Sequence, residues 1–160
     1  MQPIKLVYVE SIIDVFTNEV NKFGLVETGG VLLGYKKKDF IVITKAIGPG
    51  PNAVHEDFYF RADKHYIDMR IDIEYANSGG EIVYLGEWHT HPEVVPNPSE
   101  VDLNSLKEIA DSSGSLSLLL VLGAVGFSKS KFIENSISIL KSPEENLFFK
   151  LSPVVAVSTI

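Results

Sequence analysis

The chain has 160 residues, of which 45% are hydrophobic and 22% are charged, and its formal net charge is -7. These values are typical of a soluble globular domain, and the acidic balance disfavours a nucleic-acid partner, because phosphate binding depends on dense lysine and arginine. The chain contains no cysteine, which excludes disulfides, thiol catalysis and thiolate-held metal centres.

Neither a membrane span nor a secretory leader is expected. The first residues, MQPIKL, lack the basic and apolar regions of a signal peptide. The longest apolar run covers residues 118–127, which is about half of the length that a membrane-spanning helix requires. We therefore expect a cytoplasmic protein without a membrane partner, folded as a single domain over residues 1–160.

The first half of the chain predicts two helices with strands between them. Apolar side chains at helical spacing mark the first helix, which Gly24 is placed to end: Ile12, Ile13, Phe16, Val20 and Phe23. Strands are predicted over residues 31–35 and 40–47, with a short one over 58–60. A second helical stripe ends near Gly79 and is formed by Ala62, Tyr66, Met69, Ile73 and Ala76.

The second half predicts one more helix within a set of strands. A strand rich in β-branched and aromatic residues is predicted over residues 81–91. The third helix would bury a face made of Leu103, Leu106, Ile109 and Ala110. Further strands are predicted over residues 116–122, 131–140 and 147–157. The predicted fold class is α/β (α+β), a mixed sheet flanked by about three helices.

Two of the four histidines lie two residues apart at the end of a predicted strand, in the motif GEWHTHP of residues 86–92. Side chains at positions i and i+2 of a strand share a face, with their Cα atoms about 6.5–7 Å apart. The imidazoles of His89 and His91 can therefore converge on one metal ion. Pro92 ends the strand and leaves the pair at an open end where a ligand can approach.

The segment SEVD of residues 99–102 has two interpretations. Ser-x-x-Asp before an apolar run is typical of a capping box, in which Ser99 caps a helix and Asp102 reaches back to it. Alternatively, Asp102 turns towards the strand end and joins the two histidines as a third ligand. With no cysteine to close the shell, a fourth position would remain for water, which is the catalytic pattern.

Spacing alone leaves the general base open among four carboxylates: Glu27, Glu87, Glu93 and Glu100. Glu87 shares a face with His89, because it lies two residues before it in the same strand. Trp88 alternates with His89, so we expect it to face away from the metal and pack in the core. His55 and His65 are expected at the surface, although either would supply a fourth ligand if the site were closed.

The spacing H-x-H-P, six residues, S-x-x-D, which starts at His89, resembles the signature of the JAMM (MPN-plus) metalloproteases. The segment ETGGVLLG at residues 27–34 resembles the one that carries the catalytic glutamate of that family. The resemblance spans roughly residues 11–122 and implies a cytidine-deaminase-like JAB/MPN fold. The GEWHTHP motif is most similar to small bacterial members encoded beside E1- and E2-like proteins, which include the deconjugase of anti-phage CBASS operons.

The resemblance also implies a role for each motif residue. His89, His91 and Asp102 would ligate Zn²⁺, with no other cofactor. Glu27 would be the general acid/base, which on this ground is preferred to the other carboxylates. The Ser99 hydroxyl would stabilise the oxyanion together with the metal.

The implied activity is hydrolysis of the isopeptide or peptide bond after the C-terminus of a ubiquitin-like or otherwise conjugated protein. The tail of that protein would be the substrate, and E1- and E2-like proteins of the same operon would be partners. Two alternatives stay open: a peptidase that trims the C-terminus of a sulfur-carrier protein, and a non-catalytic scaffold module of the same fold. Gly29 and Gly30 would form either a tight turn that brings Glu27 towards the metal-bearing strand or a plain turn between helix and strand.

Overall fold

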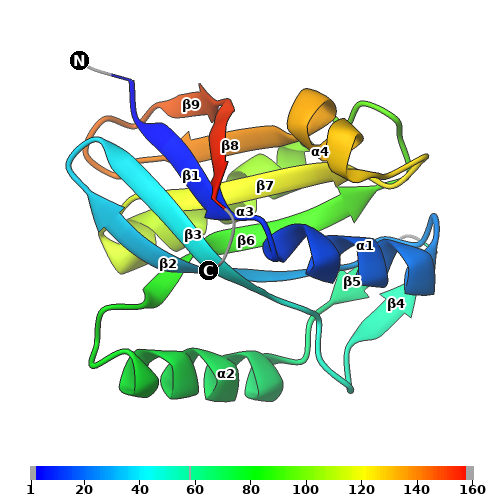
Figure 1. Ribbon diagram of the computed structural model, residues 1–160, viewed down its shortest axis with the longest axis horizontal. Coiled ribbons are helices and arrows are strands. Elements are labelled where there is room, and N and C mark those ends of the chain that lie inside the picture. Colours follow the sequence, from blue (N-terminus) through cyan, green and yellow to red (C-terminus); the bar gives the residue numbers. More distant parts are fainter. Residues whose placement is uncertain (1–2, 58, 158–160) are drawn as a thin grey trace.

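The computed structural model describes residues 3–57 and 59–157, and within them the chain forms ten strands and four helices (Figure 1). The strands are β1 (Lys5–Val9), β2 (Gly29–Lys37), β3 (Phe40–Ile47), β4 (Val54–Glu56), β5 (Tyr59–Arg61), β6 (Val83–His91), β7 (Ser117–Gly123), β8 (Ile137–Lys141), β9 (Phe148–Leu151) and β10 (Pro153–Val157). The helices are α1 (Ile12–Phe23), α2 (Lys64–Asn77), α3 (Glu100–Ser113) and α4 (Lys129–Asn135). No helix in these described ranges is both long and apolar enough to span a membrane.

Eight of the described strands form one mixed sheet in the order β10-β1-β3-β2-β6-β7-β8-β9, and β4 and β5 form a separate hairpin. β1 is parallel to β10 and β3, and β6 is parallel to β7, whereas the other neighbours are antiparallel. The two edge strands, β9 and β10, are separated in the sequence by Ser152 alone, so the sheet has to curl (Figure 1). The predicted mixed α/β class is confirmed.

Alternation along the central strands divides the core into two layers. On β7, Leu118 and Leu120 pack into the largest cluster, beneath α1 and α4. Leu119 and Val121 point to the opposite face and pack against Leu106 of α3. A third cluster lies between β2 and α2. Helices α1 and α4 therefore cover one face of the sheet, and α2 and α3 cover the other, which is why β7 is apolar along nearly its whole length.

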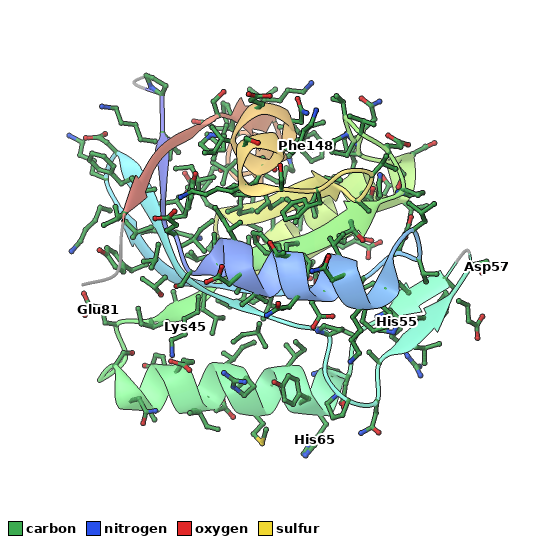
Figure 2. All side chains as sticks on the ribbon, turned by 45° about the vertical axis from the view of Figure 1, so that its right-hand side comes forward. Lys45, His55, Asp57, His65, Glu81 and Phe148 are labelled. Atoms are coloured by element: carbon green, nitrogen blue, oxygen red, sulfur yellow. The ribbon has the colours of Figure 1, made fainter. Side chains whose placement is uncertain are left out.

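The predicted buried stripe of α2 is wrong over its second half. Ala62 and Tyr66 do pack against the sheet, but Met69 and Ile73 are exposed and Ala76 lies at the surface; the buried face carries Ile67, Ile71 and Glu74 instead. The carboxylate of Glu74 lies 2.7 Å from Nζ of Lys45 on β3, and Figure 2 shows Lys45 between the sheet and the helix. An ion pair thus links to β3 a turn of α2 for which helical periodicity predicted apolar contacts only.

The predicted strand over residues 131–140 is also wrong in its first half. Its start is α4, which Ser128 caps by accepting a hydrogen bond of 3.3 Å from the amide of Lys131. Phe132 is buried, with its ring centroid 5.1 Å from that of Tyr8 and 5.7 Å from that of Phe16. The helix therefore presents one large aromatic side chain to the core. The apolar residues of this segment do not by themselves distinguish such a short helix from a strand.

The other boundaries follow the predictions with local differences. The first helix is confirmed, and its Gly24 adopts a φ of 61° and donates to the carbonyl of Val20, as a C-cap does. The predicted strand over 147–157 is two strands, because β9 pairs with β8 whereas β10 pairs with β1. Strands β1 and β4 were not predicted. Of the short strand predicted over residues 58–60, residue 58 lies outside the described residues, and β5 begins at the next residue.

Gly29 and Gly30 do not form the predicted tight turn; they are the first residues of β2. A Cβ atom on Gly29 would lie 2.4 Å from the carbonyl oxygen of Trp88, and one on Gly30 would lie 1.8 Å from that of Ile47. Both oxygens belong to the backbone of neighbouring strands and cannot turn aside. The glycines therefore allow β2 to approach β3 and β6 closely beside the histidine pair.

Candidate metal centre

His89 and His91 lie at the end of β6, on the same face, as the sequence predicts. Their Nε2 atoms are 3.0 Å apart, and their ring centroids are 4.8 Å apart. His91 is buried and His89 is half-buried, so the two rings meet in a shielded position. The strand ends at His91, and Pro92 begins the loop that leads to α3.

Asp102 unites the two interpretations of its segment. Its backbone amide donates to Ser99 Oγ at 3.1 Å, and its Oδ2 accepts from the Ser99 amide at 2.7 Å, which completes a capping box at the start of α3. The same carboxylate places Oδ1 3.3 Å from Nε2 of His89 and Oδ2 3.2 Å from Nε2 of His91. The cap thus aims the carboxylate at the histidines.

The protonation of this group follows from its contacts. Burial alone raises the pKa of Asp102, but the hydrogen bonds from His89 and His91 outweigh it and hold the pKa well below its ordinary value. The pKa of His91 is raised, chiefly by its hydrogen bond to Asp102 and against the effect of burial. An anionic carboxylate between two imidazoles is a cation-binding arrangement.

The three donor atoms have the spacing that a metal ion requires. They all lie within 4.8 Å of one another, and among the described residues no other such group of histidine, cysteine or carboxylate side chains occurs. Ligand atoms about 2.0–2.1 Å from a tetrahedral zinc ion lie roughly 3.3 Å apart. The two Nε2 atoms lie 3.0 Å apart, and each lies 3.2 to 3.3 Å from a different oxygen of Asp102, which is close to that spacing. Two imidazole nitrogens with one carboxylate suit zinc and leave a fourth position open.

Glu27 lies across the strand pair from His91. β2 and β6 are antiparallel, and their ladder continues one step beyond β2 through a hydrogen bond of 2.9 Å from the Thr90 amide to the Thr28 carbonyl. Continuing that register places Glu27 opposite His91, and directly opposite residues project to the same face. The charge of Glu27 accordingly adds to the raised pKa of His91, after the larger contribution of Asp102.

Thr28 and Thr90, for which the sequence predicted no role, fasten the Glu27 segment to β6. Both are buried, and the Thr28 amide donates to Thr90 Oγ1 at 3.1 Å, while Thr90 Oγ1 donates back to the Thr28 carbonyl at 3.4 Å. One signal in the sequence could have found Thr90. It occupies a position that strand alternation buries, and a buried hydroxyl needs a hydrogen-bond partner.

Replacing Thr90 with valine should lower the free energy of unfolding by about 1–3 kcal/mol, because the buried Thr28 amide loses its acceptor. Hydrogen exchange of the Thr28 amide should accelerate in the same variant. Thr90→Ser is the matched control, since it keeps the acceptor and should keep that amide protected. Equal protection of Thr28 in the valine and serine variants would contradict this role.

Two of the four candidate bases, Glu27 and Glu87, line a groove beside the histidines. This groove of about 740 Å³ between α2 and α3 has the metal centre at one end, and Glu27, Glu87, His89 and Asp102 all line it. Glu93 and Glu100 do not line this groove. Glu93 accepts from the Asn97 amide in the loop, although its charge also adds to the raised pKa of His91, and Glu100 is the first residue of α3. Burial raises the pKa of Glu87, although the nearby His89 partly lowers it.

Ser99 keeps a free proton for a further contact. Its Oγ accepts a hydrogen bond from the Asp102 amide within the capping box, so its own hydroxyl hydrogen is not used by the cap. The residue is exposed and is held beside the carboxylate that faces both histidines. Ser99 does not line the groove, so its predicted contact with the oxyanion stays a prediction.

The remaining histidines stay outside the group of three. Figure 2 shows His65 on the outer side of α2, where it is exposed as predicted, and His55 on the β4–β5 hairpin close to the end of α1. The surface prediction for His55 is wrong. This side chain is half-buried, stacks on Phe23 with centroids 3.6 Å apart, and its Nε2 lies 3.1 Å from Thr28 Oγ1. His55 therefore braces the same segment that Thr90 holds.

Trp88 confirms the alternation along β6. It is buried on the face opposite the histidines, its Nε1 donates to the carbonyl of Ile47 at 3.0 Å, and its ring lies 4.7 Å from that of Phe16. Trp88, which lies between Glu87 and His89 in the sequence, is therefore a core residue, as predicted.

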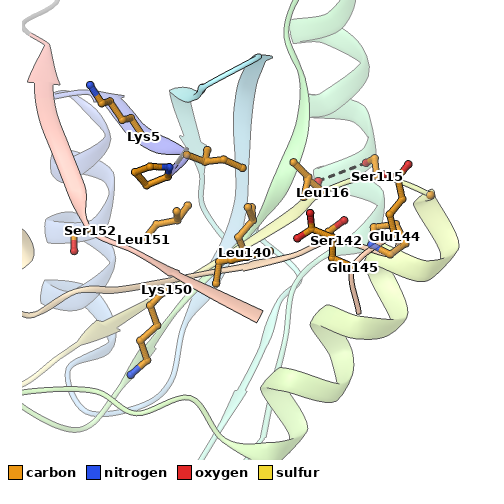
Figure 3. A pocket seen from close by; sticks show the side chains of 15 residues that line it. Lys5, Ser115, Leu116, Leu140, Ser142, Glu144, Glu145, Lys150, Leu151 and Ser152 are labelled. Carbon is orange, nitrogen blue, oxygen red and sulfur yellow. Dashed lines mark hydrogen bonds between the residues drawn. The ribbon is translucent and has the colours of Figure 1, made fainter. Parts of the chain in front are cut away.

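A second cavity of about 720 Å³ has no part in the metal centre. Figure 3 shows its lining near the start of β1 and the end of β8, with Lys5, Leu116 and Leu140 among the residues drawn. Its lining contains no histidine, and it shares no residue with the groove of the metal centre.

Comparison with known sequences finds relatives over most of the chain. A family described as prokaryotic homologs of the JAB domain matches residues 10–135. An Escherichia coli protein named CD-NTase/cGAS isopeptidase is 33% identical over 115 residues, which cover 72% of this chain and 73% of that protein. A Sinorhizobium fredii protein named probable metalloprotease is 33% identical over 111 residues, covering 68% of each. A Vibrio cholerae protein named CD-NTase/cGAS isopeptidase is 32% identical, covering 74% of this chain and 75% of that protein.

Among solved structures, the solution structure of a Desulfitobacterium hafniense protein aligns with a TM-score of 0.64 at 14% sequence identity. The alignment covers 93% of this chain and 91% of that one. At this identity the likeness concerns the fold alone.

Proposed function

The chain belongs to the family of prokaryotic homologs of the JAB domain, and from this premise we propose that it is a zinc-dependent isopeptidase. As a family member with relatives named isopeptidase and metalloprotease, it is a hydrolase of the JAMM type. The observation that carries the finer proposal is the triangle of His89, His91 and Asp102, with Glu27 beside it in one groove. Three ligands alone could bind a metal ion with a structural role, whereas a carboxylate beside them can act as the general base that hydrolysis requires.

His89, His91 and Asp102 would hold the zinc ion, because one donor atom from each lies within 4.8 Å of the others and the Asp102 carboxylate contacts both imidazoles. The chemistry that zinc supplies when bound is Lewis-acid activation, which lowers the pKa of water and polarises the scissile carbonyl. The capping box of Ser99 supports this role by fixing the direction of the Asp102 carboxylate before any metal arrives.

Glu27 is the proposed acid and base. Its carboxylate accepts one proton from the attacking water as the oxygen of that water adds to the scissile carbonyl carbon. The carbon–nitrogen bond then breaks, and Glu27 returns the proton to the amine that leaves. Ser99 donates its free hydroxyl hydrogen to the carbonyl oxygen as negative charge develops there.

We propose that the substrate is a protein conjugate, cleaved after the C-terminus of a ubiquitin-like or otherwise conjugated protein. Three of the relatives cited above act in hydrolysis by name, and two of those names specify an isopeptidase for CD-NTase/cGAS proteins. From the resemblance of the GEWHTHP motif to bacterial members encoded beside E1- and E2-like proteins, we also propose such partners, a cytoplasmic setting and a role in anti-phage defence.

The proposal is tested in the source organism by comparing strains that express the wild-type chain or the Glu27→Gln variant. We expect isopeptide-linked conjugates, identified by branched peptides in mass spectrometry, to accumulate in the Glu27→Gln strain. Purified zinc-loaded wild-type protein added to that lysate should remove them, and Asp102→Ala protein should not. Loss of C-terminal residues from an unconjugated small protein would favour trimming instead, and unchanged conjugates in every arm would contradict the proposal.

A further inference from the structure

Glu87 is a carboxylate at the floor of the groove that the proposed chemistry does not use. In the sheet it lies directly opposite Val31 on β2 and Leu119 on β7, and directly paired residues project to the same face. Val31 is 5% exposed and Leu119 is 3% exposed, so apolar side chains flank Glu87 on both sides. Its position on β6, two residues before His89, places it on the same face as the metal centre.

Aliphatic side chains from both helices line part of the groove above Glu87. Helix α2 contributes Ile67 and Ile71 on one side, and α3 contributes Leu106 and Ile109 on the other. The groove is about 740 Å³ in volume and extends from the metal centre over the sheet between these helices. The Glu87 carboxylate thus lies at the base of a groove whose sides combine these aliphatic side chains with polar ones, among them Lys64 and Ser105.

Within the described residues, the Glu87 carboxylate has no hydrogen bond or ion pair. The other acidic groups of the groove are accounted for: Asp102 faces the histidines, Asp68 pairs with Lys64, and Glu27 lies across from His91. A carboxylate shielded by apolar neighbours is costly to keep without a counter-charge. Lys64 also lines the groove but pairs with Asp68, and within the described residues no lysine or arginine forms an ion pair with Glu87.

The side chains that fit such a groove are those of lysine and arginine. Both have a long aliphatic stem, which can pack between the isoleucine and leucine side chains, and a cationic head, which can pair with the carboxylate at the floor. A purely apolar side chain would leave the charge of Glu87 unpaired, and an acidic one would be repelled. Charge and shape thus favour the same class of ligand.

We propose that the groove between α2 and α3 binds a lysine or arginine side chain of the protein substrate, with Glu87 as its ion-pair partner. The identification of the ligand as part of the substrate rests on the proposed function, whereas the affinity for a basic side chain does not. Because Glu87 and His89 are neighbours on one strand face, the basic residue lies within a few residues of the bond that is cleaved. Glu87 is thus a specificity-determining residue and not a second base.

The test uses zinc-loaded, ¹⁵N-labelled protein and three pentapeptides, acetyl-Ala-Ala-Xaa-Ala-Ala-amide, in which Xaa is lysine, arginine or norleucine. Norleucine has the aliphatic stem of lysine without the charge. Titration followed by NMR should shift the amides of Val31, Glu87 and Leu119 with the two basic peptides. We expect the norleucine peptide to bind about ten- to a hundredfold more weakly, which is the range for one charged contact.

Two variants test whether Glu87 is responsible for the preference for the basic peptides. Glu87→Gln should reduce the affinity for the basic peptides to that of the norleucine peptide. Glu108→Gln, which removes the same charge from an exposed position on α3, should leave all three affinities unchanged. Equal binding of lysine and norleucine peptides, unchanged binding by Glu87→Gln, or no shifts in the groove would each overturn the proposal. If the peptides discriminate but conjugates never accumulate in the Glu27→Gln strain, the proposed function fails and the basic subsite stands.

Discussion

Glu27→Gln should reduce the rate of conjugate hydrolysis by at least about 100-fold, while the protein retains about one zinc ion per chain. Glutamine keeps the size and the hydrogen-bonding oxygen of the side chain, but it cannot accept the proton of water and return it to the leaving amine. Zinc should be retained because the three donor atoms come from β6 and α3, and Glu27 comes from neither. The measurement combines elemental analysis with hydrolysis of the conjugates that accumulate in the variant strain.

Two further variants make this prediction specific. Glu100→Gln removes a carboxylate that is exposed at the start of α3 and does not line the groove, so its rate should stay close to that of the wild type. Glu87→Gln should weaken the selection of basic side chains and still hydrolyse substrates. If Glu87→Gln were inactive on every substrate and Glu27→Gln were active, the base would be Glu87.

Asp102→Ala should weaken zinc binding by more than about 100-fold, because it removes a ligand atom, and changes to residues that merely support a ligand already cost 10–100-fold. The Asp102 carboxylate contacts both histidines at 3.2 and 3.3 Å, so its loss also removes the anion that favours a cation there. Zinc should be measured by competition with a chelator of known affinity and by elemental analysis.

Ser99→Ala separates metal binding from helix capping. It removes the Oγ that accepts from the Asp102 amide, and should lower the free energy of unfolding by about 1 kcal/mol with zinc still bound. Denaturant unfolding of both apoproteins gives the cost of the cap. If Asp102→Ala lost only that stability and bound zinc like the wild type, its carboxylate would be a cap and not a ligand.

Much of the candidate site could be predicted because its spacings are local. His89 and His91 share a face in any extended strand, and Ser99 and Asp102 form a capping box wherever a helix begins there. Neither relation depends on the rest of the fold. The strands around the site were predicted for a similar reason, since runs such as β7 are too apolar to lie at the surface.

The predictions of secondary structure and burial were wrong where a contact with a residue far away in the chain stabilises the observed conformation. The inward face of α2 includes Glu74, whose ion pair with Lys45 on β3 cannot be predicted from helical periodicity. The start of α4 follows from the fit of Phe132 against Tyr8 and Phe16. Each choice is made by a contact between segments far apart in the chain.

Local spacing alone predicted two imidazoles and a carboxylate that can converge on a metal ion, in a chain without thiols, and the resemblance to the JAMM signature added Glu27 as the acid and base. Which carboxylates lie beside this group depends on the tertiary structure, because Glu27 comes opposite His91 through the pairing of β2 with β6 and the hydrogen bonds between Thr28 and Thr90. The tertiary structure also placed Glu87 between Val31 and Leu119, at the floor of the groove. Residue spacing determines which side chains share one face of a segment, whereas strand register determines which side chains of other segments lie opposite them.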